Sequence, residues 1–160
     1  MPIHIVLYEP EIPQNTGNIA RSCAATGSVL HLVGPLGFSI SDRHLKRAGL
    51  DYWHLVEVAY HERWSDYLAA YPSVPRFLAT TKASVPYNEL TYPDDCHLVF
   101  GPESRGLPDA VLHGAHDPCI RIPMLPAIRS LNLSNSVAVI LFEALRQHGF
   151  PGFETGASRP

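Results

Sequence analysis

Apolar residues follow two different periods along this chain of 160 residues. Short apolar runs predict β-strands, and the longer segments between them, in which apolar positions recur every three or four residues, predict amphipathic α-helices. Residues 14–26 have the helical pattern, with Ile19, Cys23 and Ala24 on one face and Gly27 as the stop signal. Because strands alternate with helices, we predict an α/β fold with a mostly parallel sheet covered on both faces.

The same patterns place the individual elements along the chain. Strands are predicted at 3–8, 29–33, 77–80, 97–100 and 120–122, and helices at 14–26, 41–48, 62–71, 108–114 and 134–148. The segment 52–60 is ambiguous but includes the strand-like residues 55–58. We expect Asn15 or Thr16 to cap the first helix and Ser41-Asp42 to cap the second.

Length and composition favour one globular domain over residues 1–160, with 151–160 as a flexible tail rich in Gly, Pro and Ser. No apolar run approaches the roughly 20 residues of a membrane span. No basic region precedes the apolar N-terminal stretch, as it would in a signal peptide. We therefore expect a cytoplasmic protein with no membrane partner.

The spacing of cysteines and histidines does not indicate a metal site. Cys23, Cys96 and Cys119 lie far apart without a CxxC pair, and the nine histidines contain no HExxH. We expect no metal, no disulfide framework and thiols that are buried by packing alone.

The usual signatures of nucleotide and nucleic-acid binding are also missing. The formal net charge is −3, whereas single nucleic-acid-binding domains are often basic, and the chain has neither a GxGxxG nor a GxxxxGK[ST] motif. Affinity for RNA nevertheless depends on where the positive charge lies, so composition alone leaves the partner open.

An unusual segment, residues 9–21, joins the first strand to the first helix. Two prolines stiffen it, and Asn15, Asn18 and Arg21 are expected near the carboxyl end of the sheet, where α/β proteins bind ligands. A capped helix with a surface arginine is the commoner explanation of such a segment.

A second unusual segment, residues 98–108, runs from a buried strand into a loop rich in glycine and proline. Gly101 permits close approach of the backbone to a ligand, or backbone dihedral angles that other residues rarely adopt. We expect Glu103 and Arg105 to pair with each other or with a ligand. A simple turn between strand and helix is the alternative, but it leaves the charged residues between two conformationally special ones unexplained.

A third unusual segment, residues 120–137, contains a proline-stiffened apolar loop before the last helix. Ser130, Asn132, Ser134 and Asn135 are interleaved there with leucines. An N-cap needs only one such residue, so the surplus of amides and hydroxyls indicates contact with a polar ligand.

Together these segments resemble the SPOUT superfamily of methyltransferases, its motifs matching NTGNIAR, FGPESRGLP and IPMLPAIRSLNLSNSVAVILFEALR. Within it the chain is most similar to the short tRNA (cytidine(34)-2′-O)-methyltransferases, through IVLYEPEIPQNTGNIAR and RHLKRAGLDYW. The resemblance extends from Ile3 to Pro151. It implies a parallel-sheet SPOUT fold with a C-terminal trefoil knot, in which the chain at 120–135 threads through a loop.

The resemblance also implies a cofactor, S-adenosylmethionine, with S-adenosylhomocysteine as the product and no metal. The family's cofactor contacts fall on Ala79, Gly101, Ile122 and Ser130, with Thr80 and Leu131 adjoining them.

Catalytic roles are implied for Arg21, Asn15, Ser130 and Asn132. The arginine that matches Arg21 has been considered the base that deprotonates the ribose hydroxyl. A guanidinium stays protonated in proteins, so we expect Arg21 instead to hold an RNA phosphate and stabilise the developing alkoxide. The other three residues, with Asn135, are expected to orient the ribose or the methionine end of the cofactor.

The implied reaction is 2′-O-methylation of the wobble ribose, at cytidine or uridine 34 of tRNA. The implied partners are the tRNA anticodon stem-loop and a second copy of the chain, with the first and last helices at the homodimer interface. Apolar surface for that interface is expected from Val137, Ile140, Leu141 and Leu145, and a wholly internal core is the alternative for them. Residues expected to contact RNA are Arg21, Arg43, Lys46, Arg47, Glu103 and Asn135.

Two alternatives remain open from the sequence. The target ribose could belong to another position of tRNA or to ribosomal RNA, or the chain could be a catalytically idle RNA-binding module.

Overall fold

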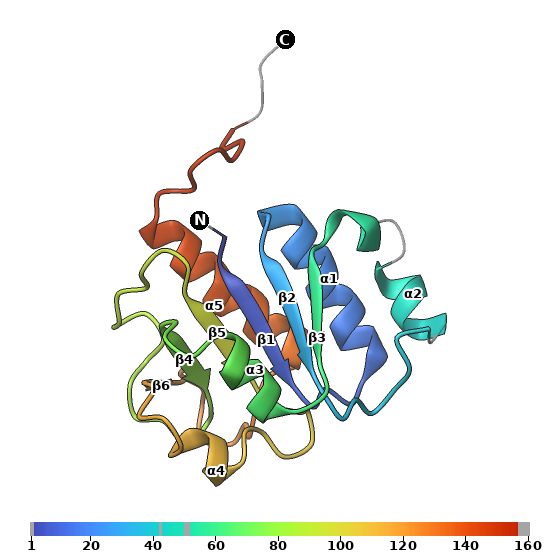
Figure 1. The fold of residues 1–160 in the computed structure, drawn as a ribbon. Helices are drawn as coiled ribbons and strands as arrows, with labels where there is room; N and C mark the ends of the chain where they lie inside the picture. The colour runs from blue at the N-terminus through green and yellow to red at the C-terminus, as the bar shows by residue number, and fades with distance from the viewer. Residues whose placement is uncertain (1, 42, 50–51, 157–160) are drawn as a thin grey trace.

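The computed structural model describes residues 2–41, 43–49 and 52–156, and within the second helix it leaves the side chains of residues 46 and 48 undescribed. One sheet of six parallel strands has the order β3-β2-β1-β5-β4-β6 (Figure 1). The strands are β1 (His4–Tyr8), β2 (Val29–Val33), β3 (Val58–His61), β4 (Arg76–Ala79), β5 (His97–Phe100) and β6 (Cys119–Ile120). The helices are α1 (Pro13–Thr26), α2 (Arg43–Gly49), α3 (Trp64–Ala70), α4 (Asp109–Leu112) and α5 (Leu133–Gln147), with a 3₁₀ turn η1 (Trp53–Leu55).

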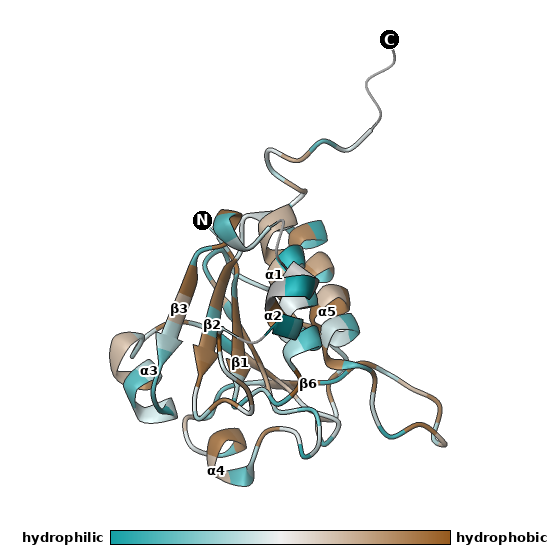
Figure 2. Ribbon diagram, turned by 90° about the vertical axis from the view of Figure 1, so that its right-hand side faces the viewer, coloured by the Kyte–Doolittle hydropathy of each residue, from teal (hydrophilic) through white to brown (hydrophobic). Residues whose placement is uncertain are grey.

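Helices cover both faces of the sheet, as the alternating pattern predicts (Figure 2). On one face α1 and α5 bury a large core against β1, β2 and β5, and Ile19, Cys23 and Leu141 are fully buried in it. On the other face α3 and α4 bury a smaller core that contains Tyr67 and Leu112. The predicted α/β class with a parallel sheet is therefore confirmed.

Several predicted boundaries are wrong for identifiable reasons. The strand-like residues 55–58 belong mostly to η1 and the turn after it, and the strand is β3, displaced toward the C-terminus. The last strand is 119–120 rather than 120–122, because Arg121 instead forms an isolated bridge with Pro86. Asp42, half of the predicted cap of α2, lies outside the described residues, and α2 begins at Arg43.

The predicted cap of α1 is also wrong. Helix α1 begins at Pro13, whose fixed φ suits the first helical position, so that Ile12 is the N-cap residue and supplies no side-chain cap. Asn15 and Thr16 are buried within the first turn. At the other end Gly27 ends the helix in the left-handed conformation, as predicted, and its N–H donates to the carbonyl of Cys23.

Beyond α5, Phe153 packs against Phe150 at the edge of the larger core, and residues 157–160 of the predicted tail lie outside the described part of the chain. The thiols of Cys23 and Cys96 are buried and that of Cys119 is partly buried, all unpaired. None of the described helices is long and apolar enough to cross a membrane.

Four histidines from four strands meet on the sheet face that α3 covers. His31 of β2 lies between His4 of β1 and His61 of β3, at nitrogen–nitrogen distances of 2.7 Å and 3.1 Å. His97 of β5 stacks on His4, and the hydroxyl of Tyr67 lies 2.8 Å from Nδ1 of His97. Burial, aided by the neighbouring imidazoles, lowers the pKa of His31 and of His97 to about 3.

These buried imidazoles make the fold acid-sensitive. His31 and His97 stay neutral in the folded chain but bind protons below pH 6.5 in the unfolded chain, so the unfolding free energy falls as the pH drops from 6.5 toward 3. While only the unfolded state is protonated, each group removes about 1.4 kcal/mol per pH unit. Urea denaturation at pH 7.5 and 5.5, with a chelator present, measures this loss. His31→Leu should flatten the dependence and the exposed His113→Gln should not; equal slopes in all three proteins would contradict the prediction.

Candidate functional site

A cleft of about 540 Å³ opens at the carboxyl edge of the sheet, beyond the last residues of β1, β4, β5 and β6. Strand order reverses between β1 and β5, and such a switch point is where open α/β sheets bind ligands. The three segments singled out in the sequence all reach this cleft. Its lining includes the predicted residues Asn15, Ala79, Thr80, Gly101, Glu103, Ile122, Ser130, Leu131 and Asn132.

Gly101 is needed at this edge for a reason other than the one the sequence suggests. A Cβ on Gly101 would lie 2.2 Å from the backbone nitrogen of Leu107 and 2.3 Å from the carbonyl carbon of Gly106. The loop after β5 therefore folds back on its own first residue, and Gly106 closes it at a φ of +68°. A side chain at position 101 would therefore meet the loop itself.

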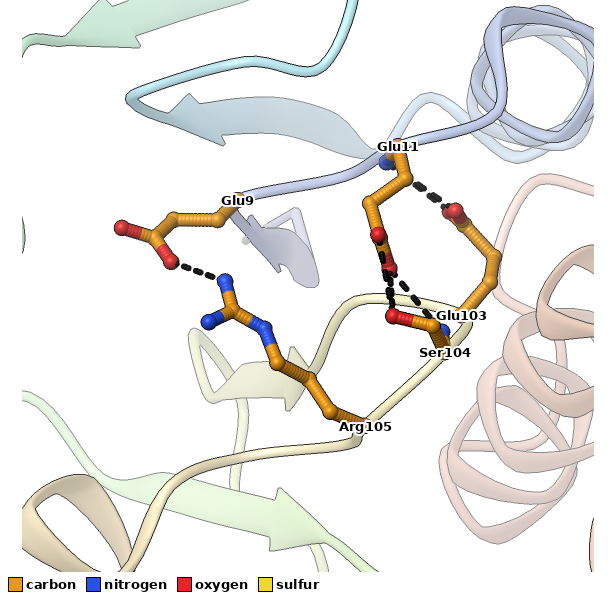
Figure 3. A network of polar contacts seen from close by, with 5 residues as sticks. All are labelled: Glu9, Glu11, Glu103, Ser104 and Arg105. Atoms are coloured by element: carbon orange, nitrogen blue, oxygen red, sulfur yellow. Dashed lines mark hydrogen bonds and ion pairs between the residues drawn. The ribbon is translucent and has the colours of Figure 1, made fainter.

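Each residue from 103 to 105 in this loop makes a polar contact with the segment after β1 (Figure 3). The carboxylate of Glu11 accepts from the backbone N–H of Ser104 at 2.9 Å and from its hydroxyl at 2.7 Å. Arg105 forms an ion pair with Glu9. Glu103 and Arg105 do not pair with each other, so this one of the two sequence alternatives is wrong. Each instead contacts the segment after β1.

Glu103 replaces the missing side-chain cap of α1. Its carboxylate accepts from the backbone N–H groups of Glu11 and Ile12, both at 2.9 Å, just before the helix starts. Partial burial raises the pKa of Glu103, and the two backbone hydrogen bonds oppose that rise. The loop after β5 thus fixes the start of the helix that carries Asn15 and Arg21.

Replacement of Glu103 by alanine should loosen the start of α1. Two N–H groups lose a charged acceptor, and loss of a helix cap costs about 1–2 kcal/mol. Urea denaturation measures this, and Glu103→Gln, which keeps an acceptor oxygen, should recover part of the loss. Ser104→Ala, which loses the hydroxyl contact to Glu11 but leaves both hydrogen bonds of Glu103 in place, serves for comparison and should cost less. No change in stability in Glu103→Ala would remove Glu103 from this role.

Asn132 connects the third segment to the first. Its Nδ2 donates to Oδ1 of Asn15 at 3.1 Å, and its Oδ1 caps α5 by accepting from the backbone N–H of Ser134 at 2.9 Å. One residue therefore supplies the predicted N-cap and a link to α1. Ser130 is exposed on the cleft lining, whereas Asn135, also exposed, is not part of it.

Arg21 lies apart from the cleft of its own chain. Its guanidinium sits over the ring of Tyr52, 4.7 Å from the ring centroid, and Nη2 donates to the tyrosine hydroxyl at 3.4 Å. Helix α2 packs against α1 and exposes Arg43 and Arg47, while the side chain of Lys46 lies outside the described residues. The predicted basic residues thus gather on the α1–α2 side rather than in the cleft.

The cleft has further cations that the sequence analysis did not single out. Arg121 and Arg129 line it, as does Lys82, whose ammonium lies 3.2 Å from the carboxylate of Asp109. Lys82 follows the carboxyl end of β4 almost directly, and Arg129 lies inside the third segment. Position after a strand could have indicated Lys82, since ligand-binding residues of α/β proteins cluster there.

Known proteins resemble the chain over nearly its whole length. The profile of the SpoU rRNA Methylase family matches residues 2–142. A tRNA (cytidine(34)-2′-O)-methyltransferase of Methylovorus glucosotrophus is 52% identical, over 92% of this chain and 97% of the relative. The enzyme of that name from Escherichia coli K12 is 48% identical, over 94% of this chain and 96% of the relative.

Solved structures agree with these relatives. One from work on 2-OH methylation of C/U34 on tRNA has a TM-score of 0.88 at 46% identity, covering 92% of this chain and 97% of its own. An AdoMet-bound rRNA methyltransferase from Sinorhizobium meliloti has a TM-score of 0.82 at 26% identity, covering 91% of this chain and 56% of its own. By sequence and by fold, this chain belongs to the SpoU rRNA Methylase family.

Proposed function

We propose that the protein transfers a methyl group from S-adenosylmethionine to the 2′-hydroxyl of the wobble ribose, at cytidine or uridine 34 of tRNA. The observation that carries the proposal is the near-complete match to relatives of that name, together with a cleft on which all three motif segments converge. The proposed substrate is the anticodon stem-loop, and the proposed setting is the cytoplasm.

The cleft fits the proposed cofactor. Its volume of about 540 Å³ is that of a site for a small molecule. Ala79, Ile122 and Leu131 give it apolar surface suited to a purine, and Ser130 and Asn132 add hydroxyl and amide groups suited to the polar ends. S-adenosylmethionine supplies an electrophilic methyl group when bound. No residue of the proposed chemistry needs a metal ion.

The chain's own tasks are then to position the ribose and to manage charge at its 2′-oxygen. The guanidinium of Arg21 is suited to a phosphate and to the developing alkoxide, since its planar fork donates in two directions. Asn15 and Asn132 are hydrogen-bonded to each other and line the cleft, so they are placed to orient a ligand that binds there. Arg21 is not the proton acceptor in this proposal.

A radioactive methyl-transfer assay on bulk tRNA, followed by nucleoside mapping, tests the proposal. The expected product is 2′-O-methylcytidine or a 2′-O-methyluridine derivative at position 34. Methylation mapped to another tRNA position or to ribosomal RNA would replace the substrate. Cofactor binding without transfer to any RNA would leave an idle RNA-binding module instead.

The active unit is proposed to be a homodimer, because Arg21 lies outside the cleft of its own chain. Four apolar residues were expected to form the interface: Val137, Ile140, Leu141 and Leu145. All four are buried inside the chain, and the expectation that they supply interface surface is therefore wrong. Helix α5 instead exposes Val139 and Phe142, at 37% and 44% of their surface. These two side chains support α5 as an interface element.

Mixing two inactive variants tests whether each site is shared. Arg21→Ala removes the guanidinium, and Leu131→Arg places bulk and positive charge in the cleft. If Arg21 serves the partner's cleft, an equal mixture gives about half mixed dimers, each with one complete site of two, and activity should return to about a quarter of the wild-type rate. Light scattering gives the mass. No recovery from a stable mixed dimer, or a fully active monomer, would contradict the shared site.

The chain is further proposed to form the family's C-terminal trefoil knot. From the edge strand β6 it first contacts the segment near Pro86, where the N–H of Arg121 donates to the carbonyl of Val85 at 2.9 Å. It then returns to α1 through the Asn132–Asn15 contact. This path, from the edge of the sheet back to its middle, is what supports threading of residues 120–135.

A further inference from the structure

His4, His31 and His97, on the α3 side of the sheet, do not line the proposed cleft, and the proposed methyl transfer uses none of them. His4 and His97 are the first residues of β1 and β5, whereas the cleft opens beyond the last residues of these strands. One ring nitrogen from each of His4, His31 and His97 lies within 4.8 Å of the others. His31 and His97 are almost fully buried, and the His4 side chain is 12% exposed.

We propose that His4, His31 and His97 bind one transition-metal ion of the Zn²⁺ class, at a site separate from the methyltransferase cleft. Three imidazoles with one open position form a common protein site for Zn²⁺. Bonds of 2.0–2.1 Å in tetrahedral geometry hold ligand nitrogens about 3.3 Å apart. Nδ1 of His4 and Nε2 of His31 are 2.7 Å apart, closer than this, so the two rings must separate and lose their mutual hydrogen bond to admit the ion.

Each of the three ligands has an outer partner on its other ring nitrogen. Nε2 of His4 lies 3.5 Å from the carboxylate of Asp95. Nδ1 of His31 lies 3.1 Å from Nε2 of His61, and Nδ1 of His97 lies 2.8 Å from the hydroxyl of Tyr67. Partners of this kind fix the tautomer and orientation of metal-bound histidines. The arrangement assigns Nδ1 of His4 and Nε2 of His31 and His97 to the ion.

A further movement is required before the ion can bind. The rings of His4 and His97 are parallel to within 5°, with centroids 4.2 Å apart, and parallel lone pairs do not converge on one ion. His4, at the partly exposed edge of the cluster, is the ring that can turn. The fourth position is left to water, since His4 and its outer partner Asp95 are 12% and 40% exposed.

Metal titration of the chelator-stripped protein tests the site. We expect one Zn²⁺ per chain, a melting temperature that rises with Zn²⁺, and an X-ray absorption spectrum with three imidazole ligands. Co²⁺ in the same site should give the visible absorption of a tetrahedral ion. Failure to bind one equivalent, or a spectrum with fewer than three imidazoles, would overturn the proposal.

Variants separate this site from adventitious binding at the surface. His4→Gln changes the least buried ligand and should weaken Zn²⁺ binding at least tenfold. Tyr67→Phe keeps all three ligands but removes an outer partner, and should weaken binding about tenfold. The exposed His113→Gln is the matched control and should not change the affinity. Equal affinity in His4→Gln and His113→Gln would place the ion elsewhere. Circular dichroism of each apo variant separates loss of the site from loss of the fold.

Discussion

Arg21→Ala should lower kcat for methyl transfer to tRNA by a factor of about 100 to 1000, the loss typical of removing one donor from a developing oxyanion. Cofactor affinity should stay within about threefold of wild type, because Arg21 does not line the cleft of its own chain. Transfer kinetics and calorimetric titration of the cofactor measure the two effects separately.

Arg21→Lys is the informative companion. An ammonium keeps the charge but cannot reproduce the planar, two-sided donor of a guanidinium, so little activity should return. Tyr52→Phe removes only the hydrogen bond to Arg21 and keeps the ring beneath the guanidinium, so it should retain most of the activity. Near-normal turnover in Arg21→Ala would reject both the phosphate and the alkoxide roles.

Gly101→Ala should reduce both the unfolding free energy and cofactor binding. The new Cβ would lie 2.2 Å from the nitrogen of Leu107, which is backbone and cannot turn away, so the whole loop must shift. Overpacking of this kind costs about 3 kcal/mol, and a displaced loop should weaken cofactor binding at least tenfold. Urea denaturation and calorimetric titration measure the two losses.

Gly106→Ala is the matched control in the same loop. Its Cβ would meet no atom within 4 Å, and the only strain is the left-handed backbone, worth about 1–2 kcal/mol. Its cofactor affinity should therefore fall less than that of Gly101→Ala. If the two variants behaved alike, the backbone clash at Gly101 would not be the cause of its effect.

Periodicity predicted the sheet class and most elements because the buried strands and the amphipathic helices have distinct periods. It failed where local chemistry competes with the pattern. Residues 55–58 satisfy the rules for a strand, yet the 3₁₀ turn at Trp53 delays the strand until Val58. Asn15 and Thr16 are favourable caps, but Pro13 starts the helix earlier and Glu103, distant in sequence, caps it.

The residues of the site differ in the same way in how far the sequence predicts them. Residues that lie next to strand ends, such as Thr80 and Gly101, could be expected at the cleft from the sequence alone, and the structure places them there. Two other features could not be expected from the sequence alone: the pairing of Glu11 with Ser104, and the cluster of His4, His31 and His97. These partners come from separate strands or loops, and no fixed spacing in the sequence relates them. Such contacts depend on strand order, which periodicity does not specify.

The polar contacts between the segments at 9–12 and 103–105 have a thermodynamic consequence. The segment at 103–105 lines the proposed cofactor cleft, and the segment at 9–12 leads into the helix that carries Arg21. A ligand that orders one segment therefore also lowers the entropic cost of ordering the other segment. Affinities for the two ligands are then linked, and by reciprocity the factor by which cofactor tightens tRNA binding equals the factor by which tRNA tightens cofactor binding.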